Sequence, residues 1–144
     1  MKLAAMFFAE KATNAQTLSV TGALWDGLTA TAFPANHTLV TVLLLRPLPG
    51  DVGRAFPVQL HVNADADNAM AGHSHIDINC NNYREQTAVV VEVPCVFPAA
   101  GSYTVRFDGD IGTDALTFQV VGPGGQSNVA AAVEGYALGL QNKR

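Results

Sequence analysis

The segment 97–110 constrains the fold of this chain more than any other part of its sequence. A proline and a glycine near its start break the chain, because proline fixes a backbone dihedral and glycine permits tight turns. Tyr103, Val105 and Phe107 then alternate with polar residues. This alternation is typical of a strand with one buried and one exposed face. The sequence therefore predicts a turn followed by a half-buried strand.

Apolar runs bounded by Gly, Pro, Asn and Asp recur along the chain at the spacing of an all-β domain. The run from Thr38 to Arg46 is apolar on both faces, so it should be a central strand covered on both sides. The expected fold is an all-β, immunoglobulin-like antiparallel β-sandwich with a short C-terminal helical or extended tail. About eight strands are expected, near residues 3–9, 17–25, 38–46, 57–63, 73–80, 87–93, 102–108 and 115–121.

The length and composition favour one folded domain. A chain of 144 residues is long enough for a single core and too short for two ordinary domains. Its hydrophobic fraction is 49% and its charged fraction 14%, far from the composition of disordered chains. We expect a β-sandwich domain over residues 1–121, followed by a Gly/Pro linker and a C-terminal docking segment over residues 122–144.

The C-terminal segment has helical rather than strand patterning. Ser127 is a suitable N-cap for an amphipathic stretch. Gly135 and Gly139 each weaken a helix by roughly 1 kcal/mol relative to Ala, so the segment needs a surface to dock on. That surface is either its own domain or another chain. The residues expected to make the contact are Val129, Val133, Tyr136 and Leu140.

The charge pattern argues against nucleic acid and membrane as partners. The net charge is −4, and the basic residues form no internal cluster, whereas nucleic acids and anionic membranes require a basic surface. No apolar stretch approaches the ~20 residues of a membrane span. The apolar run 3–9 ends at Glu10 without a small-residue cleavage site, so we interpret it as a strand rather than a signal peptide. The expected location is the cytoplasm or an assembled particle such as a virion.

The two cysteines are expected to be free. Cys80 and Cys95 are too few for a disulfide framework and lack the CxxC spacing of redox and metal sites. In a hairpin around the Asn-Asn pair at 81–82, Cys80 would face residues near 87. A disulfide is the alternative if the two strands lie differently.

Alternating polar side chains on the predicted strand 73–80 form the first candidate site. His73, His75 and Asp77 project from one face of this strand. Histidines two residues apart on a strand are a zinc-binding geometry, and His61 on a neighbouring strand adds a third nitrogen. A solvated or hydrogen-bonded polar face is the alternative, because the outward face of any such strand is polar.

Two acidic segments form the second candidate site. Residues 65–68 and 108–114 carry aspartates whose oxygens suit Ca²⁺, which takes 6–8 oxygen ligands. Neither segment matches the EF-hand loop. A β-turn is the favoured interpretation of 108–114, because Asp and Gly tolerate left-handed dihedrals. No cofactor is expected, with zinc or calcium as the alternatives.

Catalytic motifs find little support in the sequence. There is no Gly-x-Ser-x-Gly elbow, and the serines do not lie in nucleophile motifs. The phosphate-binding glycine-rich motifs are absent as well. Both cysteines lie at or beside apolar strand positions, where a thiol is normally inert. We therefore expect a protein that is not an enzyme.

Several structural motifs carry a family resemblance. They are the opening strand, the sequence Val-Thr-Gly-Ala-Leu-Trp at 20–25, Phe33-Pro34 before the long apolar strand, and Phe-Pro-x-x-Gly-x-Tyr at 97–103. Together they resemble a family of short bacterial, largely actinobacterial and phage-associated, β-sandwich proteins of unknown function, over roughly residues 3–121. The resemblance implies a fold and no catalytic residue. The position of Tyr103 after a Pro/Gly corner also resembles the tyrosine corner of immunoglobulin-like sandwiches.

Two classes of function remain open at this point. The expected one is a non-enzymatic interaction or assembly module, an accessory or structural subunit of a bacterial or phage particle that binds a protein partner or its own copies. The alternative is a metal- or carbohydrate-binding domain that uses the His73/His75 face or the acidic loops. An enzyme built on that metal would need an open coordination position and a pocket.

Overall fold

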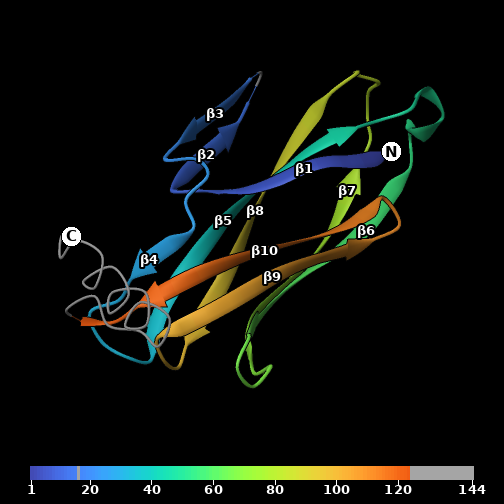
Figure 1. Ribbon diagram of the computed structural model, residues 1–144. Coiled ribbons are helices and arrows are strands. Elements are labelled where there is room, and N and C mark those ends of the chain that lie inside the picture. The colour runs from blue at the N-terminus through green and yellow to red at the C-terminus, as the bar shows by residue number, and fades with distance from the viewer. Residues whose placement is uncertain (16, 124–144) are drawn as a thin grey trace, which may run out of the picture.

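The computed structural model describes residues 1–15 and 17–123, which form strands joined by turns, with no α-helix in this part of the chain (Figure 1). The all-β prediction is therefore confirmed. No helix of the described residues is long and apolar enough to cross a membrane. The strands are β1 (Lys2–Ala9), β2 (Lys11–Asn14), β3 (Leu18–Thr21), β4 (Gly27–Thr29), β5 (Ala35–Arg46), β6 (Ala55–Ala64), β7 (Met70–Asn79), β8 (Thr87–Phe97), β9 (Gly101–Gly109) and β10 (Gly112–Val121), and a 3-10 turn, η1 (Pro49–Asp51), follows β5.

Eight of the strands form one curled sheet in the order β1-β5-β8-β7-β6-β9-β10-β4, and β2 and β3 form a separate hairpin (Figure 1). The pairings are antiparallel except for β10 with β4, which is parallel. The curl brings β1 back beside β10, where the Leu3 N–H donates to the Ile111 carbonyl at 2.9 Å. β7 and β8 are joined through one residue pair, Gly72 with Cys95. The sheet thus wraps around a single core.

The described residues contain ten strands rather than about eight. The expected strand 17–25 was too long: β3 ends at Thr21, because Gly22 and Leu24 adopt positive φ angles of 63° and 65° that a strand does not accommodate. β2 and β4 were not predicted, since strands of four and three residues are too short to show an alternating pattern.

β5 is the central strand that its apolar pattern predicts. It pairs with β1 on one side and with β8 on the other. Leu39 and Leu43 point into the core and are fully buried. Val42 faces the opposite way and is also fully buried, on the side where the β2–β3 hairpin packs against β5 and β8.

Aromatic side chains fill the centre of the core. Trp25 stacks on Phe8 at 4.7 Å between ring centroids and meets Phe118 edge-on at 5.8 Å. Tyr103 and Phe107 on β9 are buried, so the predicted register of this strand is confirmed. The aromatic pairs adopt the stacked and edge-to-face geometries that such rings prefer.

Candidate functional site

The structure brings together two of the four predicted metal ligands. His61 on β6 lies directly opposite His73 on β7 in the antiparallel register, and their ring centroids are 4.7 Å apart. His73 is exposed and His61 is half-buried. Cross-strand neighbours on one face are close enough for both imidazoles to reach a shared ligand.

The other two predicted ligands extend away from this pair along β7. His75 lies opposite Gln59, and Asp77 lies opposite Pro57. The His61 Nε2 is 3.0 Å from the Gln59 Oε1, so this ring already has a hydrogen-bond partner. Among the described residues, no group of three or more His, Cys, Asp or Glu side chains is arranged to hold a metal ion.

Arg106 is a neighbour of the histidine pair that the sequence pattern did not identify. It lies opposite His61 in the pairing of β6 with β9, and both residues line an open cavity of about 420 Å³. A guanidinium next to the imidazoles opposes the binding of a cation. The pair therefore lies in a mixed surface that includes a positive charge.

The segment 108–114 forms a β-turn, as predicted. β9 ends at Gly109 and β10 begins at Gly112, and these residues pair across a two-residue turn. Asp108 and Asp110 line an open cavity of about 280 Å³ together with Gln59 and His75. These two aspartates therefore belong to the β9–β10 hairpin and also line a polar cavity beside it.

The segment 65–68 is the turn between β6 and β7, and its first carboxylate binds a neighbouring strand. Asp65 accepts hydrogen bonds from the hydroxyls of Ser102 and Thr104 at 2.5 and 2.6 Å. These two hydrogen bonds lower the pKa of Asp65 below its ordinary value, and the bond from Ser102 has the larger effect. Asp67 accepts from the Ala69 N–H at 3.0 Å. Asp65 thus joins the turn to β9, and Asp67 stabilises the turn itself.

Both cysteines are free and buried, as predicted. The Sγ of Cys95 lies 3.4 Å from the Val93 carbonyl, and that of Cys80 lies 3.7 Å from the Asn82 carbonyl. Burial raises the pKa of Cys95 to about 12. A thiol in this environment is protonated at neutral pH and unreactive.

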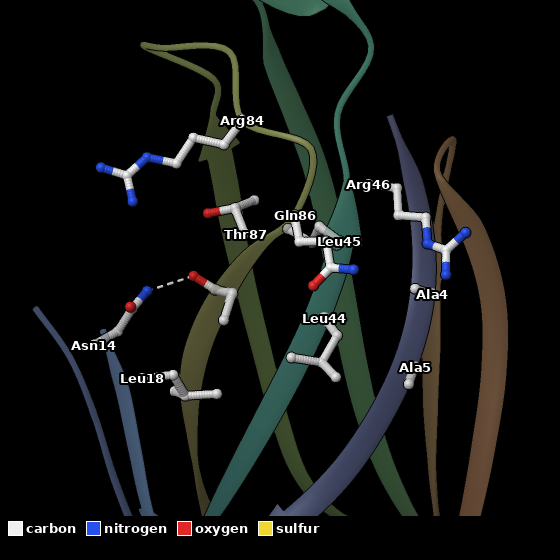
Figure 2. Close-up of a pocket in the computed structure, with 11 residues that line it drawn as sticks. Ala4, Ala5, Asn14, Leu18, Leu44, Leu45, Arg46, Arg84, Gln86 and Thr87 are labelled. Carbon is white, nitrogen blue, oxygen red and sulfur yellow. Dashed lines mark hydrogen bonds between the residues drawn. The ribbon is translucent and has the colours of Figure 1, made fainter. Parts of the chain in front are cut away.

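A groove of about 450 Å³ lies between the β2–β3 hairpin and the sheet. We call it the hairpin groove (Figure 2). Its apolar walls come from β1, β3, β5 and β8, and the Asn14 amide donates to the Ala88 carbonyl across it. Its rim carries two arginines. The lining residues are Ala4, Ala5, Asn14, Leu18, Leu44, Leu45, Arg46, Arg84, Gln86, Thr87 and Ala88.

Sequence reasoning missed the hairpin groove, because its arginines come from distant segments. Arg46 ends β5 and Arg84 lies in the loop between β7 and β8. The end of a strand and a loop between strands are both ordinary places for an arginine in any sequence. Only the position of β8 beside β5 brings the two residues to one rim. No local signal in the sequence indicates this.

Two loops meet at one end of the molecule, beside the N-terminus (Figure 1). The Gly53 N–H donates to the Cys80 carbonyl at 2.7 Å, and the Cys80 N–H donates to the Arg54 carbonyl at 3.0 Å. Both loops carry large apolar side chains that are exposed to solvent. We call them the loop-end surface: Leu48 (56% exposed), Val52 (45%) and Tyr83 (48%).

Asp51 holds the loop that carries Leu48 and Val52, two of the three residues of this surface. Its buried carboxylate accepts from the Met1 ammonium, from the Leu48 N–H at 2.8 Å and from the Arg54 guanidinium at 3.5 Å. The Met1 ammonium and then the Leu48 N–H lower the pKa of Asp51 below its ordinary value. A buried carboxylate with several donors fixes the backbone around it. Leu48 and Val52 are therefore presented by a defined loop.

Comparison with known families now adds one finding. Residues 4–121 match the model of DUF6941, a family of unknown function. The chain belongs to this family. The DUF6941 match begins within β1 and ends at the last residue of β10, close to the range that the structural motifs indicated. No curated protein matches the chain, so the DUF6941 assignment brings no activity with it.

The predicted contact residues of the C-terminal segment lie outside the described part of this DUF6941 protein. Val129, Val133, Tyr136 and Leu140 therefore stay a prediction. They also lie beyond the residues that the family model covers.

Proposed function

We propose that this chain is a non-enzymatic interaction or assembly module, serving as an accessory or structural subunit of a bacterial or phage particle. The loop-end surface is the observation that carries the proposal. Tyr83 precedes Arg84 in the chain, and Leu48 and Val52 lie on the loop that ends at Arg54. Aromatic residues and arginine are enriched in protein interfaces, and interface hot spots are enriched in Tyr and Arg. Because backbone hydrogen bonds hold these two loops in place, the surface needs no ordering step before a partner binds.

An immunoglobulin-like β-sandwich scaffold is part of this proposal. The Tyr103 hydroxyl donates to the Ala99 carbonyl, four residues upstream, at 2.6 Å. A hydrogen bond of this kind is characteristic of the tyrosine corner in immunoglobulin-like domains. Scaffolds of this class gather their loops at the two ends and use them for recognition. The position of the loop-end surface agrees with that use.

The partner under this proposal is another protein or a second copy of the chain, in the cytoplasm or in an assembled particle. Nucleic acid and membrane are not proposed as partners, because the net charge is −4. The C-terminal segment, with Val129, Val133, Tyr136 and Leu140, is proposed as a second contact element. Its support is the sequence alone, since a glycine-interrupted amphipathic stretch gains order only by burial.

Light scattering on the full chain and on a variant ending at Gly122 tests the assembly proposal. If the C-terminal segment joins subunits, the full chain should be oligomeric and the truncated chain a folded monomer. If the segment instead covers its own domain, truncation should lower the melting temperature with no change in mass. A full chain that is monomeric up to millimolar concentration contradicts self-assembly.

Point variants test the loop-end surface separately. Leu48→Ser combined with Tyr83→Ser should weaken association by about tenfold or more, because interface anchors are large apolar and aromatic side chains. Met70→Ser combined with Val96→Ser is the matched control, since these side chains are 61% and 50% exposed elsewhere. Equal effects of the two pairs would mean that the loop-end surface has no special role.

The histidine pair and the polar cavity beside it support a second candidate on the outer face of the sheet, the binding of a carbohydrate or, against the repulsion of the neighbouring Arg106 guanidinium, of a metal. The His61 and His73 rings are 4.7 Å apart, and Gln59, His75 and Asp108 line a neighbouring polar cavity suited to hydroxyl groups. Zinc titration followed by calorimetry tests the metal branch. His73→Gln should abolish stoichiometric binding of zinc, and the absence of such binding in the unmodified chain would contradict the site.

A further inference from the structure

We infer that the hairpin groove binds a short segment of a partner protein that carries a carboxylate beside an apolar side chain. This inference rests on the proposed function, because it names the class of partner that an interaction module would take. It uses a different surface from the loop-end residues. The charge, the shape and the position of the groove support it.

The charge of the groove is opposite to that of the chain. The chain carries a net charge of −4, yet both charged residues among the groove's lining are arginines. In the described part of the chain, neither Arg46 nor Arg84 forms an ion pair with a carboxylate. Lys2, the register partner of Arg46, adds a third positive charge nearby. An anionic group is therefore the complementary ligand.

The arginines and the apolar walls occupy different parts of the groove. Arg46 and Arg84 lie on opposite sides of one rim with Gln86 between them, and Leu18, Leu44 and Ala5 lie on the other side of the opening (Figure 2). The two guanidinium groups point away from each other (Figure 2), so a carboxylate at one end of the rim would pair with one of them, in the two-point geometry by which guanidinium groups bind carboxylates. An apolar side chain next to that carboxylate in the bound segment would pack on Leu18 and Leu44. The separation of the arginines from the apolar walls would therefore fix the direction in which a segment binds.

The size and position of the groove favour a peptide segment. A cavity of about 450 Å³ lies within the range of small-ligand sites, so it accepts a few side chains rather than a whole element. Arg84 belongs to the same loop as Tyr83 of the loop-end surface. A partner that contacts the loop-end surface therefore reaches the groove with a neighbouring segment. The Gln86 amide at the rim offers both a donor and an acceptor to its backbone.

The test is a nuclear magnetic resonance titration of the full chain with the peptide acetyl-Leu-Glu-Leu-amide. Backbone amide shifts should concentrate at residues 44–46 and 84–88. The double variant Arg46→Gln with Arg84→Gln should raise the dissociation constant by about tenfold or more. Arg106→Gln, which removes an exposed arginine from β9, should leave the constant unchanged. The replaced side chains are exposed, so melting temperatures should not change.

Three results would overturn the inference: shifts that map elsewhere or do not arise, equal binding of acetyl-Leu-Gln-Leu-amide, or binding of octanoate in the groove without binding of the peptide. The last result would identify a small amphiphile as the ligand. Failure of this titration leaves the light-scattering result on assembly intact. Conversely, a monomeric full chain that binds the peptide in the groove would contradict self-assembly and keep the groove as a binding site.

Discussion

The hydroxyl of Tyr103 donates a hydrogen bond to the carbonyl oxygen of Ala99, 2.6 Å away and four residues earlier in the chain. The tyrosine ring is buried against Phe97, with 4.8 Å between ring centroids. This bond fixes the turn that leads from β8 into β9. Because β9 pairs with both β6 and β10, the geometry of this turn affects the register of these three strands.

Tyr103→Phe should lower the free energy of unfolding by about 1–2 kcal/mol, because the phenylalanine keeps the packing and leaves the Ala99 carbonyl without this donor. Urea denaturation measures the change. Tyr83→Phe is the control, since Tyr83 is 48% exposed and should change stability by less than about 0.5 kcal/mol. Equal losses in the two variants would show that the corner bond does not stabilise the fold.

Much of the fold can be predicted from local pattern, because burial imposes alternation on half-buried strands. Val58, Leu60 and Val62 alternate with polar residues in the sequence and are buried in the structure. The pattern does not predict β2 and β4, since strands of three or four residues are too short to show an alternation of apolar and polar residues. β4 depends instead on its parallel pairing with β10, a long-range contact that no local pattern contains.

The candidate sites could be predicted only in part. The His73/His75 row was found because alternation places both on one face, but the approach of His61 depends on the register between β6 and β7. The hairpin groove could not be predicted. Its walls come from β1, β3, β5 and β8, so it exists only after β5 has paired with β1 and β8 and the hairpin has packed on these strands.

Thr41→Val should leave the protein equally stable or raise its free energy of unfolding by about 1 kcal/mol. The Thr41 side chain is fully buried, and its hydroxyl has no hydrogen-bond partner among the described residues. Valine has the same shape without the cost of burying an unpaired hydroxyl. Thr38→Val, on an exposed position of the same strand, controls for strand propensity. A clear loss of stability for Thr41→Val alone would mean that the hydroxyl does have a partner.

The two thiols should react slowly in the folded protein. Cys95 is 3% exposed, and burial raises its pKa to about 12, so it carries almost no thiolate at neutral pH. A colorimetric thiol reagent should modify the native chain slowly and both cysteines rapidly in guanidinium chloride. Fast modification of native Cys95 would contradict its burial, and two unreactive cysteines after unfolding would indicate a disulfide.

The stability of the fold should depend on pH through Asp65. Because the Ser102 and Thr104 hydroxyls lower its pKa in the folded state, ionised Asp65 stabilises the fold above the unfolded pKa of about 3.9. This contribution is lost as the pH falls through the folded pKa. Asp65→Asn should therefore be less stable than the unmodified chain at neutral pH, and the difference should shrink below about pH 4. Asp110→Asn, which replaces an exposed aspartate in the β9–β10 turn, controls for the loss of one negative charge.

Gly72→Ala should destabilise the junction between the two halves of the sheet. A Cβ at Gly72 would lie 2.5 Å from the Cys95 Sγ and 2.8 Å from the Pro94 carbonyl, so β7 and β8 would have to separate at their one shared pair. We expect a loss of about 1–3 kcal/mol in urea denaturation. Adding Cys95→Ala should restore only part of it, because the carbonyl contact remains. Gly50→Ala is the control, because a Cβ at this position has no atom within 4 Å and the variant should be as stable as the unmodified chain. If Gly72→Ala is equally stable, the junction is not tightly packed.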